Sequence, residues 1–75
     1  MMHTYTLKTN YEMDESGQIV TVYGIEARNA KGDLLLSVPG IFCNLQKAIQ
    51  FVSLCNDLKI SLIHLHDVIE DALAE

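Results

Sequence analysis

The sequence predicts an α+β fold in which a three-stranded antiparallel meander carries two C-terminal helices packed on one face (βββαα). Residues 3–13 and 18–29 alternate polar and apolar side chains, turn-forming residues follow each segment, and the second half has apolar residues at helical spacing. Consecutive strands joined by short turns pair as antiparallel neighbours, so no crossover connection is needed. With 75 residues, the chain is expected to form a single domain over residues 1–75.

The first hairpin is expected to turn at Asp14-Glu15-Ser16-Gly17. Asp at the first position accepts hydrogen bonds from the turn backbone, and Gly at the fourth tolerates positive φ, which is typical of a type I turn followed by a glycine bulge. This turn pairs Asp14 with Gln18 and Leu7 with Ile25, and it places the apolar side chains of both strands on one face. For three tyrosines on that face, packing in the core is favoured over an aromatic recognition patch: Tyr5, Tyr11 and Tyr23.

The second turn, Asn29-Ala30-Lys31-Gly32-Asp33, allows two strand registers. A bulged turn like the first pairs Asn29 with Asp33 and directs two side chains inward, Leu35 and Ser37. A two-residue loop at Lys31-Gly32 instead directs three apolar side chains inward, Leu34, Leu36 and Val38. We favour the second register because it buries more apolar area, and a shift of one residue moves every side chain to the opposite face. Pro39-Gly40 is expected to end the third strand, since proline lacks a backbone donor.

Two amphipathic helices are expected after the third strand. Asn44 is a good N-cap for the first, whose apolar stripe is broad enough to touch two surfaces: Leu45, Ala48, Ile49, Phe51, Val52, Leu54, Cys55 and Leu58. Ser61 is expected to cap the second, from Leu62 to about Ala74, with one apolar face made of Leu62, Leu65, Ile69, Ala72 and Leu73. Acidic residues near its C-terminus oppose the helix dipole, so the last turn is expected to fray.

Charge and composition limit the classes of function. The chain has 5 basic and 10 acidic residues, a formal net charge of −5. Nucleic acids and anionic membranes are bound through basic surfaces, so neither is an expected partner. The sequence shows no signal-peptide pattern and no apolar run of the ~20 residues that a membrane span needs. A cytoplasmic location is therefore expected. Two cysteines without metal-site spacing are expected to be small buried hydrophobes: Cys43 and Cys55.

A cluster of possible metal ligands lies on the predicted second helix. His66 and Glu70 are four residues apart and share a helix face, and His64 and Asp67 form a second such pair. His64 and His66 point about 200° apart around a regular helix, so the two cannot bind one ion together. A metal would need further ligands, for which His3 is a candidate. The favoured interpretation places His66 at the edge of the core and gives His64 a solvated or capping role, with no metal and no other cofactor.

No catalytic residues are predicted. The two cysteines have no basic neighbour in the sequence that would activate a thiol, and the paired carboxylates Asp14-Glu15 and Glu70-Asp71 are expected to be solvated. The chain is 49% hydrophobic, which predicts that a second copy or another protein covers part of its surface. The candidate interface residues lie on the outer sheet face, between strand edges that are open to pairing: Val20, Val22 and Leu35.

Three short segments carry a family resemblance: Tyr23-Gly24-Ile25, Cys55-Asn56, and His64 to Asp71 with the sequence His-Leu-His-Asp-Val-Ile-Glu-Asp. Together they resemble a family of small uncharacterised proteins from Gram-positive anaerobic bacteria, classed as a domain of unknown function. The resemblance covers nearly the whole chain, from Tyr5 to Leu73. The family has no known activity, so the resemblance implies no catalytic residue, but it gives weight to three positions for capping, docking or binding: His64, Asp67 and Asp71.

The leading functional hypothesis is a small non-catalytic protein-interaction or regulatory module that forms a homodimer. It rests on the apolar fraction, the open sheet edges and the absence of a catalytic set in the sequence. The alternative is a metal- or small-ligand-binding protein that uses the His64–Asp71 helix.

Overall fold

The sheet is an antiparallel meander of three strands. The computed structural model describes residues 3–74, in which β1 (His3–Met13), β2 (Ile19–Asn29) and β3 (Leu34–Phe42) are ordered β1-β2-β3. Two helices follow the strands, which confirms the predicted βββαα fold. Each described helix is too short or too polar to cross a membrane.

The first hairpin has the predicted turn and register. The Asp14 N–H donates to the Gln18 carbonyl at 2.8 Å, and Gly17 has a φ of +86°, as a bulged type I turn requires. Leu7 lies opposite Ile25, as predicted. The Asp14 carboxylate accepts hydrogen bonds from the Ser16 hydroxyl at 2.7 Å and from the Gln18 N–H at 2.9 Å, so it is built into the turn.

The second turn has the same form, so the favoured register is wrong at the turn itself. The Asn29 N–H donates to the Asp33 carbonyl at 3.1 Å, and Gly32 has a φ of +87°. Leu34 is therefore paired with Arg28 and is half exposed instead of facing the core. Local turn chemistry prevails here because the side chain of Asn29 also accepts hydrogen bonds from the turn backbone.

A β-bulge after this turn restores the apolar face of β3. The pairing shifts by one residue at Leu35, so that Leu36 lies opposite the buried Ala27 and Val38 lies opposite the buried Ile25. Leu36 and Val38 therefore pack against the core, as the favoured register predicted for these two positions. The extra residue of the bulge reconciles the turn chemistry with the hydrophobic pattern.

β3 continues through Pro39-Gly40, where the sequence predicted its end. The pairing with β2 shifts again at this point, and Gly40 adopts a φ of +66°. The bulge brings the β3 backbone onto Gly24 of β2. A Cβ on Gly24 would lie 2.1 Å from the Val38 carbonyl oxygen, so the close approach requires glycine.

The first helix, α1 (Leu45–Asp57), begins as predicted. The Asn44 side chain accepts a hydrogen bond from the Lys47 N–H at 3.0 Å. The second helical segment differs from the prediction, because it consists of a 3₁₀ turn, η1 (Leu62–His64), and a shorter helix, α2 (Leu65–Leu73). Ser61 does not cap the backbone, since its hydroxyl bonds to His64 Nδ1 at 2.9 Å instead.

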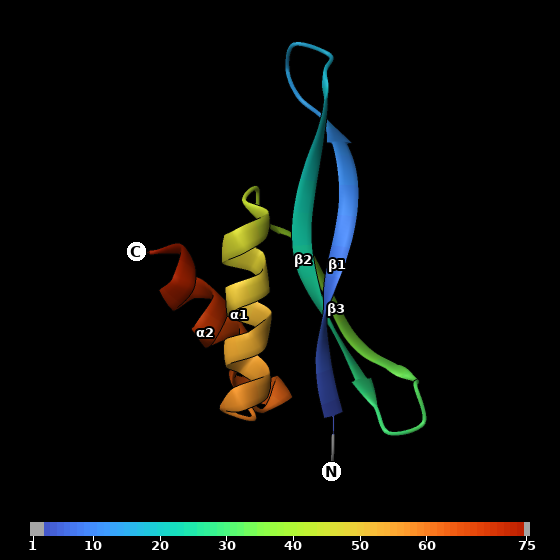
Figure 1. Ribbon diagram of the computed structural model, residues 1–75, viewed down its shortest axis with the longest axis vertical. Helices are drawn as coiled ribbons and strands as arrows, with labels where there is room; N and C mark the ends of the chain where they lie inside the picture. The colour runs from blue at the N-terminus through green and yellow to red at the C-terminus, as the bar shows by residue number, and fades with distance from the viewer. Residues whose placement is uncertain (1–2, 75) are drawn as a thin grey trace.

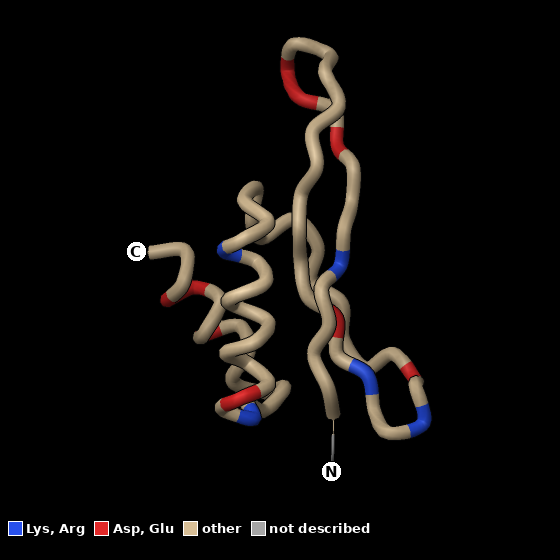
Figure 2. The backbone as a smooth tube through the Cα atoms, in the orientation of Figure 1, with Lys and Arg blue, Asp and Glu red and all other residues tan. Residues whose placement is uncertain are grey.

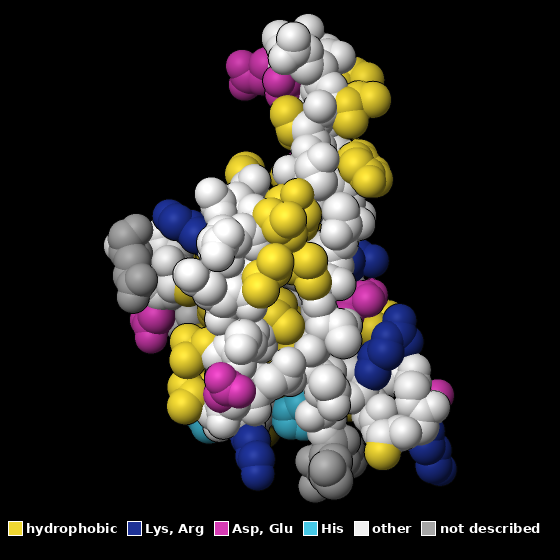
Figure 3. Space-filling view, viewed as in Figure 1, with side chains coloured by type: hydrophobic (Ala, Val, Ile, Leu, Met, Phe, Trp, Pro, Cys, Tyr) yellow, Lys and Arg dark blue, Asp and Glu magenta, His cyan; other side chains and the backbone are white. Residues whose placement is uncertain are grey.

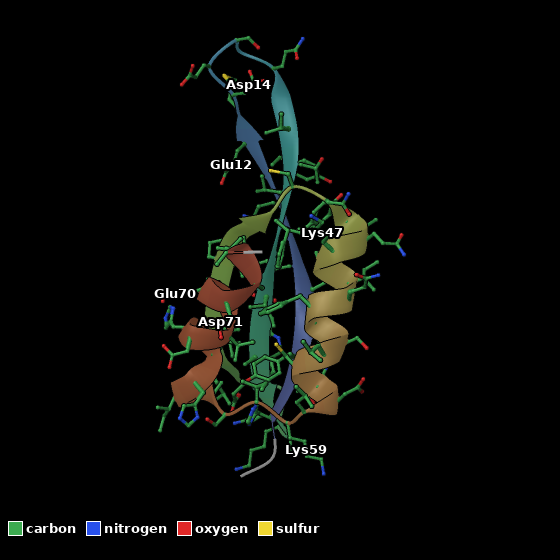
Figure 4. The ribbon with its side chains drawn as sticks, turned by 90° about the vertical axis from the view of Figure 1, so that its left-hand side faces the viewer. Glu12, Asp14, Lys47, Lys59, Glu70 and Asp71 are labelled. Atoms are coloured by element: carbon green, nitrogen blue, oxygen red, sulfur yellow. The ribbon has the colours of Figure 1, made fainter. Side chains whose placement is uncertain are left out.

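The two helices lie side by side on one face of the sheet, and the core lies between these two layers (Figure 4). The predicted apolar face of this helix included Leu73 and did not include Val68. In α2, Val68 packs against the core and Leu73 is exposed, because Leu65, Val68, Ile69 and Ala72 share one helix face. The buried core residues come from both layers: Tyr5, Ile25, Ala27, Phe51, Cys55, Leu65 and Ile69.

Candidate interaction surface

The distal part of the β1–β2 hairpin extends beyond both helices (Figure 1). We call residues 9–22 the arm. β3 pairs with β2 only as far as Tyr23, so two strands alone continue into the arm. Three apolar side chains of the arm are largely exposed, Tyr11 at 72%, Met13 at 70% and Ile19 at 72%. The prediction that Tyr11 packs in the core is wrong, because the helices do not reach its position, whereas Tyr5 is buried and Tyr23 is half-buried.

The predicted interface residues have different environments. Val20 lies on the arm and is exposed, whereas Val22 is only 6% exposed. Val22 lies on the outer face, where the Pro39-Gly40 bulge approaches the arm; a Cβ on Gly40 would lie 3.4 Å from the Glu12 carboxylate. Leu35 is half-buried and packs against the core. These three residues therefore do not form one exposed patch.

The edge of β1 is unpaired along the arm. Hydrogen-bonded pairs alternate along an antiparallel ladder, and Asp14 bonds to Gln18 at the turn. The even-numbered residues of β1 therefore bond to β2, and the backbone groups of the odd-numbered residues point away from it. Within residues 3–74, β1 has no strand on its other side. We call the odd-numbered residues between positions 7 and 13 the open edge: Leu7, Thr9, Tyr11 and Met13.

Asn56 closes the β1 edge just below the open edge. Its Oδ1 accepts the Tyr5 N–H at 2.8 Å, and its Nδ2 donates to the Tyr5 carbonyl at 2.9 Å. The amide thus bonds both backbone groups of Tyr5, as a neighbouring strand would. The sequence pattern did not predict this contact, because the two residues are 51 positions apart in the chain. The open edge therefore starts at Leu7.

The α1 face that carries Asn56 also carries two exposed apolar residues. Ile49 and Leu45 precede Asn56 by seven and eleven residues, which places each of them within about 20° of Asn56 around the helix. Ile49 is 52% exposed and Leu45 is 46% exposed. Because α1 runs antiparallel to β1 (Figure 1), these two residues lie farther toward the arm than Asn56. Figure 3 shows hydrophobic side chains gathered along this boundary between α1 and the hairpin, and others on the arm.

Charged side chains occupy the outer face of the same hairpin. Lys8 Nζ lies 3.5 Å from Glu26 Oε2, and Arg28 lies 3.8 Å from the same carboxylate. Glu12 forms no ion pair with any other residue in the range 3–74. Figure 2 shows acidic residues toward the tip of the arm and a basic residue farther down the same strand. At the tip, the Ser16 hydroxyl and then the Gln18 N–H lower the pKa of Asp14 by hydrogen bonding to its carboxylate.

The predicted metal ligands do not converge. His64, His66, Asp67 and Glu70 are all exposed, and the 3₁₀ turn removes His64 from the regular helix that was expected to pair it with Asp67. His3 is engaged elsewhere, since its Nε2 lies 2.8 Å from the Ile60 carbonyl oxygen. Among residues 3–74, no group of three or more His, Cys, Asp or Glu side chains is placed to hold a metal ion.

A hollow of about 350 Å³ lies between α1 and α2. Its lining is mostly apolar, with Phe42 and Phe51 among its residues, and Lys47 and Asp71 contribute charged side chains from the two helices (Figure 4). Within the described chain, no polar or charged residue is buried. The hollow therefore lacks the convergent buried polar groups that orient a specific small ligand.

The two cysteines have different environments. Cys55 is fully buried in the core, as predicted. Cys43 is exposed, so the prediction of burial is wrong for this residue. It lies between the end of β3 and the N-cap of α1, in the short connection that passes from the sheet to the helix layer.

These features define a small two-layer α+β protein with a projecting two-stranded arm. The chain belongs to a family of unknown function, DUF6514, whose model matches residues 1–75. This confirms the resemblance to a family of unknown function. No curated protein and no solved structure matches the chain.

Proposed function

We propose that the protein is a small non-catalytic interaction or regulatory module that works as a homodimer in the cytoplasm of Gram-positive anaerobic bacteria. The arm carries this proposal. It combines an unpaired strand edge with three largely exposed apolar side chains, Tyr11, Met13 and Ile19. An exposed apolar strand edge favours pairing with another chain, and natural proteins usually protect such edges with charges, bulges or covering segments.

Binding without catalysis is supported by the surroundings of the candidate reactive groups. The Asp14 carboxylate is used by the turn, and Glu70 and Asp71 are exposed on α2. Cys55 is buried in the apolar core, where a thiol is inert. Nucleophilic catalysis requires a nucleophile, a base and an orienting group in contact, and these residues do not form such a set.

The oligomeric state of the untagged protein tests this proposal. We expect light scattering coupled to size exclusion to show a dimer that dissociates on dilution. The double variant Tyr11→Ser/Met13→Ser should raise the dissociation constant by at least about tenfold, since it removes apolar area from the interface. Ile63→Ser is the matched control, because Ile63 is 87% exposed in η1 and lies outside the arm. A monomer at every concentration would overturn the proposed homodimer.

A further inference from the structure

We infer that two copies join edge to edge through β1, in an antiparallel pairing centred on Asn10 that forms one continuous six-stranded sheet. This inference rests on the proposed homodimer and specifies its interface. The Asn56 side chain already hydrogen-bonds the N–H and the carbonyl of Tyr5, so the edge available for pairing runs from Leu7 to Met13. Asn10 is the midpoint of this stretch. A twofold axis at Asn10 therefore pairs the open edge with the whole open edge of the second copy.

In this register, every outward-pointing backbone N–H and carbonyl of the open edge has a hydrogen-bond partner. Leu7 lies opposite the partner's Met13, and Thr9 lies opposite the partner's Tyr11. Residues whose backbone groups point outward form hydrogen-bonded pairs, and each pair exchanges two bonds. An axis at Thr9 would require the Tyr5 backbone, which Asn56 already binds. An axis at Tyr11 would leave Leu7 opposite the turn, without a strand residue to pair with.

The charges on the outer face support the same register independently. Within the available edge, this face carries one base and one acid, Lys8 and Glu12, placed symmetrically about Asn10. The axis puts Lys8 directly opposite the partner's Glu12, and this pair occurs twice in the dimer. Opposite charges stabilise such cross-strand pairs and like charges destabilise them. An axis at Lys8 or at Glu12 would set two like charges against each other.

The apolar residues of α1 lie where the arm of the second copy would pass. A twofold axis perpendicular to the sheet keeps the helices of both copies on one face of the sheet. At ~1.5 Å per helix residue and ~3.3 Å per strand residue, Ile49 is level with Lys8 and Leu45 is level with Asn10. The partner's Tyr11 and the partner's Met13 lie opposite this part of β1. Exposed apolar side chains of the arm and of α1 thus cover each other.

The two copies of α1 do not compete for the same space. By the same rise per residue, α1 begins near the level of the axis. It runs back along β1, away from the arm (Figure 1). The twofold operation sends the second copy of α1 in the opposite direction from the axis. Each arm therefore lies beside α1 of the other copy. This arrangement is possible because the arm extends beyond its own helices.

The side chain of Asn10 lies on the axis itself. Its Oδ1 is buried and has no hydrogen-bond partner within residues 3–74. Directly opposed residues that are not backbone-bonded have Cα atoms about 4.5 Å apart, so the two Asn10 side chains are neighbours. Rotation of both amides toward the axis lets each Nδ2 donate to the Oδ1 of the other copy. The dimer thus supplies the partner that this oxygen lacks.

A charge exchange tests the register. Lys8→Glu and Glu12→Lys each place like charges at both symmetric positions, so each variant alone should dimerise about tenfold more weakly. In an equal mixture, the heterodimer again joins Lys to Glu at both positions. Analytical ultracentrifugation should therefore show recovery to near the wild-type dissociation constant. Glu26→Gln is the matched control: it removes the intrachain ion-pair partner of Lys8 and leaves the dissociation constant unchanged.

A cross-link provides a second measurement. In a Cys43→Ser background, Asn10→Cys places two thiols opposite each other, at a Cα separation that a disulfide spans. Oxidised glutathione accepts the two electrons, and we expect a covalent dimer on a non-reducing gel. Lys31→Cys in the same background is the control, because Lys31 is exposed in the second turn, away from the open edge. It should form no rapid cross-link.

The possible results separate this interface from the proposed function. Recovery of dimerisation in the mixture, together with the Asn10 cross-link, supports the interface. A wild-type dimer that neither charge variant weakens, and that Asn10→Cys does not cross-link, overturns the interface and leaves the homodimer in place. A wild-type monomer at all concentrations overturns both.

Discussion

The side-chain amide of Asn56, at the end of α1, hydrogen-bonds both backbone groups of Tyr5 on the edge strand. The two residues are 51 positions apart in the chain, so this contact fixes the helix layer to the sheet. Tyr5 also donates its hydroxyl hydrogen to the Ile60 carbonyl, which fixes the loop after α1 to the same strand. The edge of β1 is therefore closed next to the core and open along the arm.

Asn56→Ala should destabilise the fold, because it leaves the Tyr5 N–H and carbonyl without partners in a partly buried position. We expect the free energy of unfolding to fall by about 1–3 kcal/mol in urea titrations. Asn56→Asp should also destabilise, since a carboxylate cannot donate to the Tyr5 carbonyl. Gln50→Ala is the control on the exposed surface of α1, with an expected change within about 0.5 kcal/mol. Equal stability of Asn56→Ala and wild type would show that the amide contributes nothing.

Gly24→Ala should destabilise more than Gly32→Ala. A Cβ on Gly24 would lie 2.1 Å from the Val38 carbonyl oxygen, so the β2–β3 backbone pairing must shift. A Cβ on Gly32 meets nothing within 4 Å, and its cost comes only from the φ of +87°. We expect losses of about 3 kcal/mol or more for Gly24→Ala and about 1–2 kcal/mol for Gly32→Ala. Thermal melts followed by circular dichroism would measure both, and the reverse order would contradict the close approach.

The second hairpin shows how far the sequence could predict the fold. Turn residues correctly predicted a bulged turn, and the hydrophobic pattern correctly predicted that Leu36 and Val38 face the core. The two signals conflict only if the strand is regular. An inserted residue at Leu35 lets both be satisfied, and nothing in the local sequence distinguishes a bulge from a uniform shift of register.

The candidate site was less predictable than the fold. Alternation correctly places Tyr11 and Met13 on the inner face, but it does not give the length of strand that the helices cover. Tyr5 is buried and Tyr11 is exposed because the helix layer covers only part of β1 (Figure 1). The Asn56–Tyr5 contact joins two segments that are far apart in the sequence, so local propensities cannot predict it. The exposed edge therefore required the three-dimensional arrangement.

Native protein should react with a thiol reagent at one cysteine. Cys43 is exposed and Cys55 is fully buried, so an aromatic disulfide reagent should modify one thiol rapidly under native conditions and two in denaturant. The Cys43→Ser variant should show no rapid reaction in the folded state. Rapid modification of both thiols in the native wild-type protein would contradict the burial of Cys55.

Stability should decline on the alkaline side because two buried acidic groups are neutral in the folded protein. Burial raises the pKa of the Cys55 thiol. Burial, and then the proximity of Cys55, raise the pKa of the Tyr5 hydroxyl. Both groups lose their protons at lower pH in the unfolded chain than in the folded one. Their contribution is therefore fully present below about pH 8 and is lost as the pH rises through their folded pKa values.

Cys55→Ala isolates the thiol contribution to this pH dependence. At pH 7 the variant should be less stable by about 1 kcal/mol, because it leaves a small cavity in the core. Above about pH 9 the difference in stability from wild type should shrink, because ionisation of this thiol stabilises the unfolded state of the wild-type protein only. Cys43 is present in both proteins, so it cancels in the comparison. Urea titrations at a series of pH values would measure the difference, and a constant offset between the two proteins from pH 7 to pH 10 would contradict the linkage.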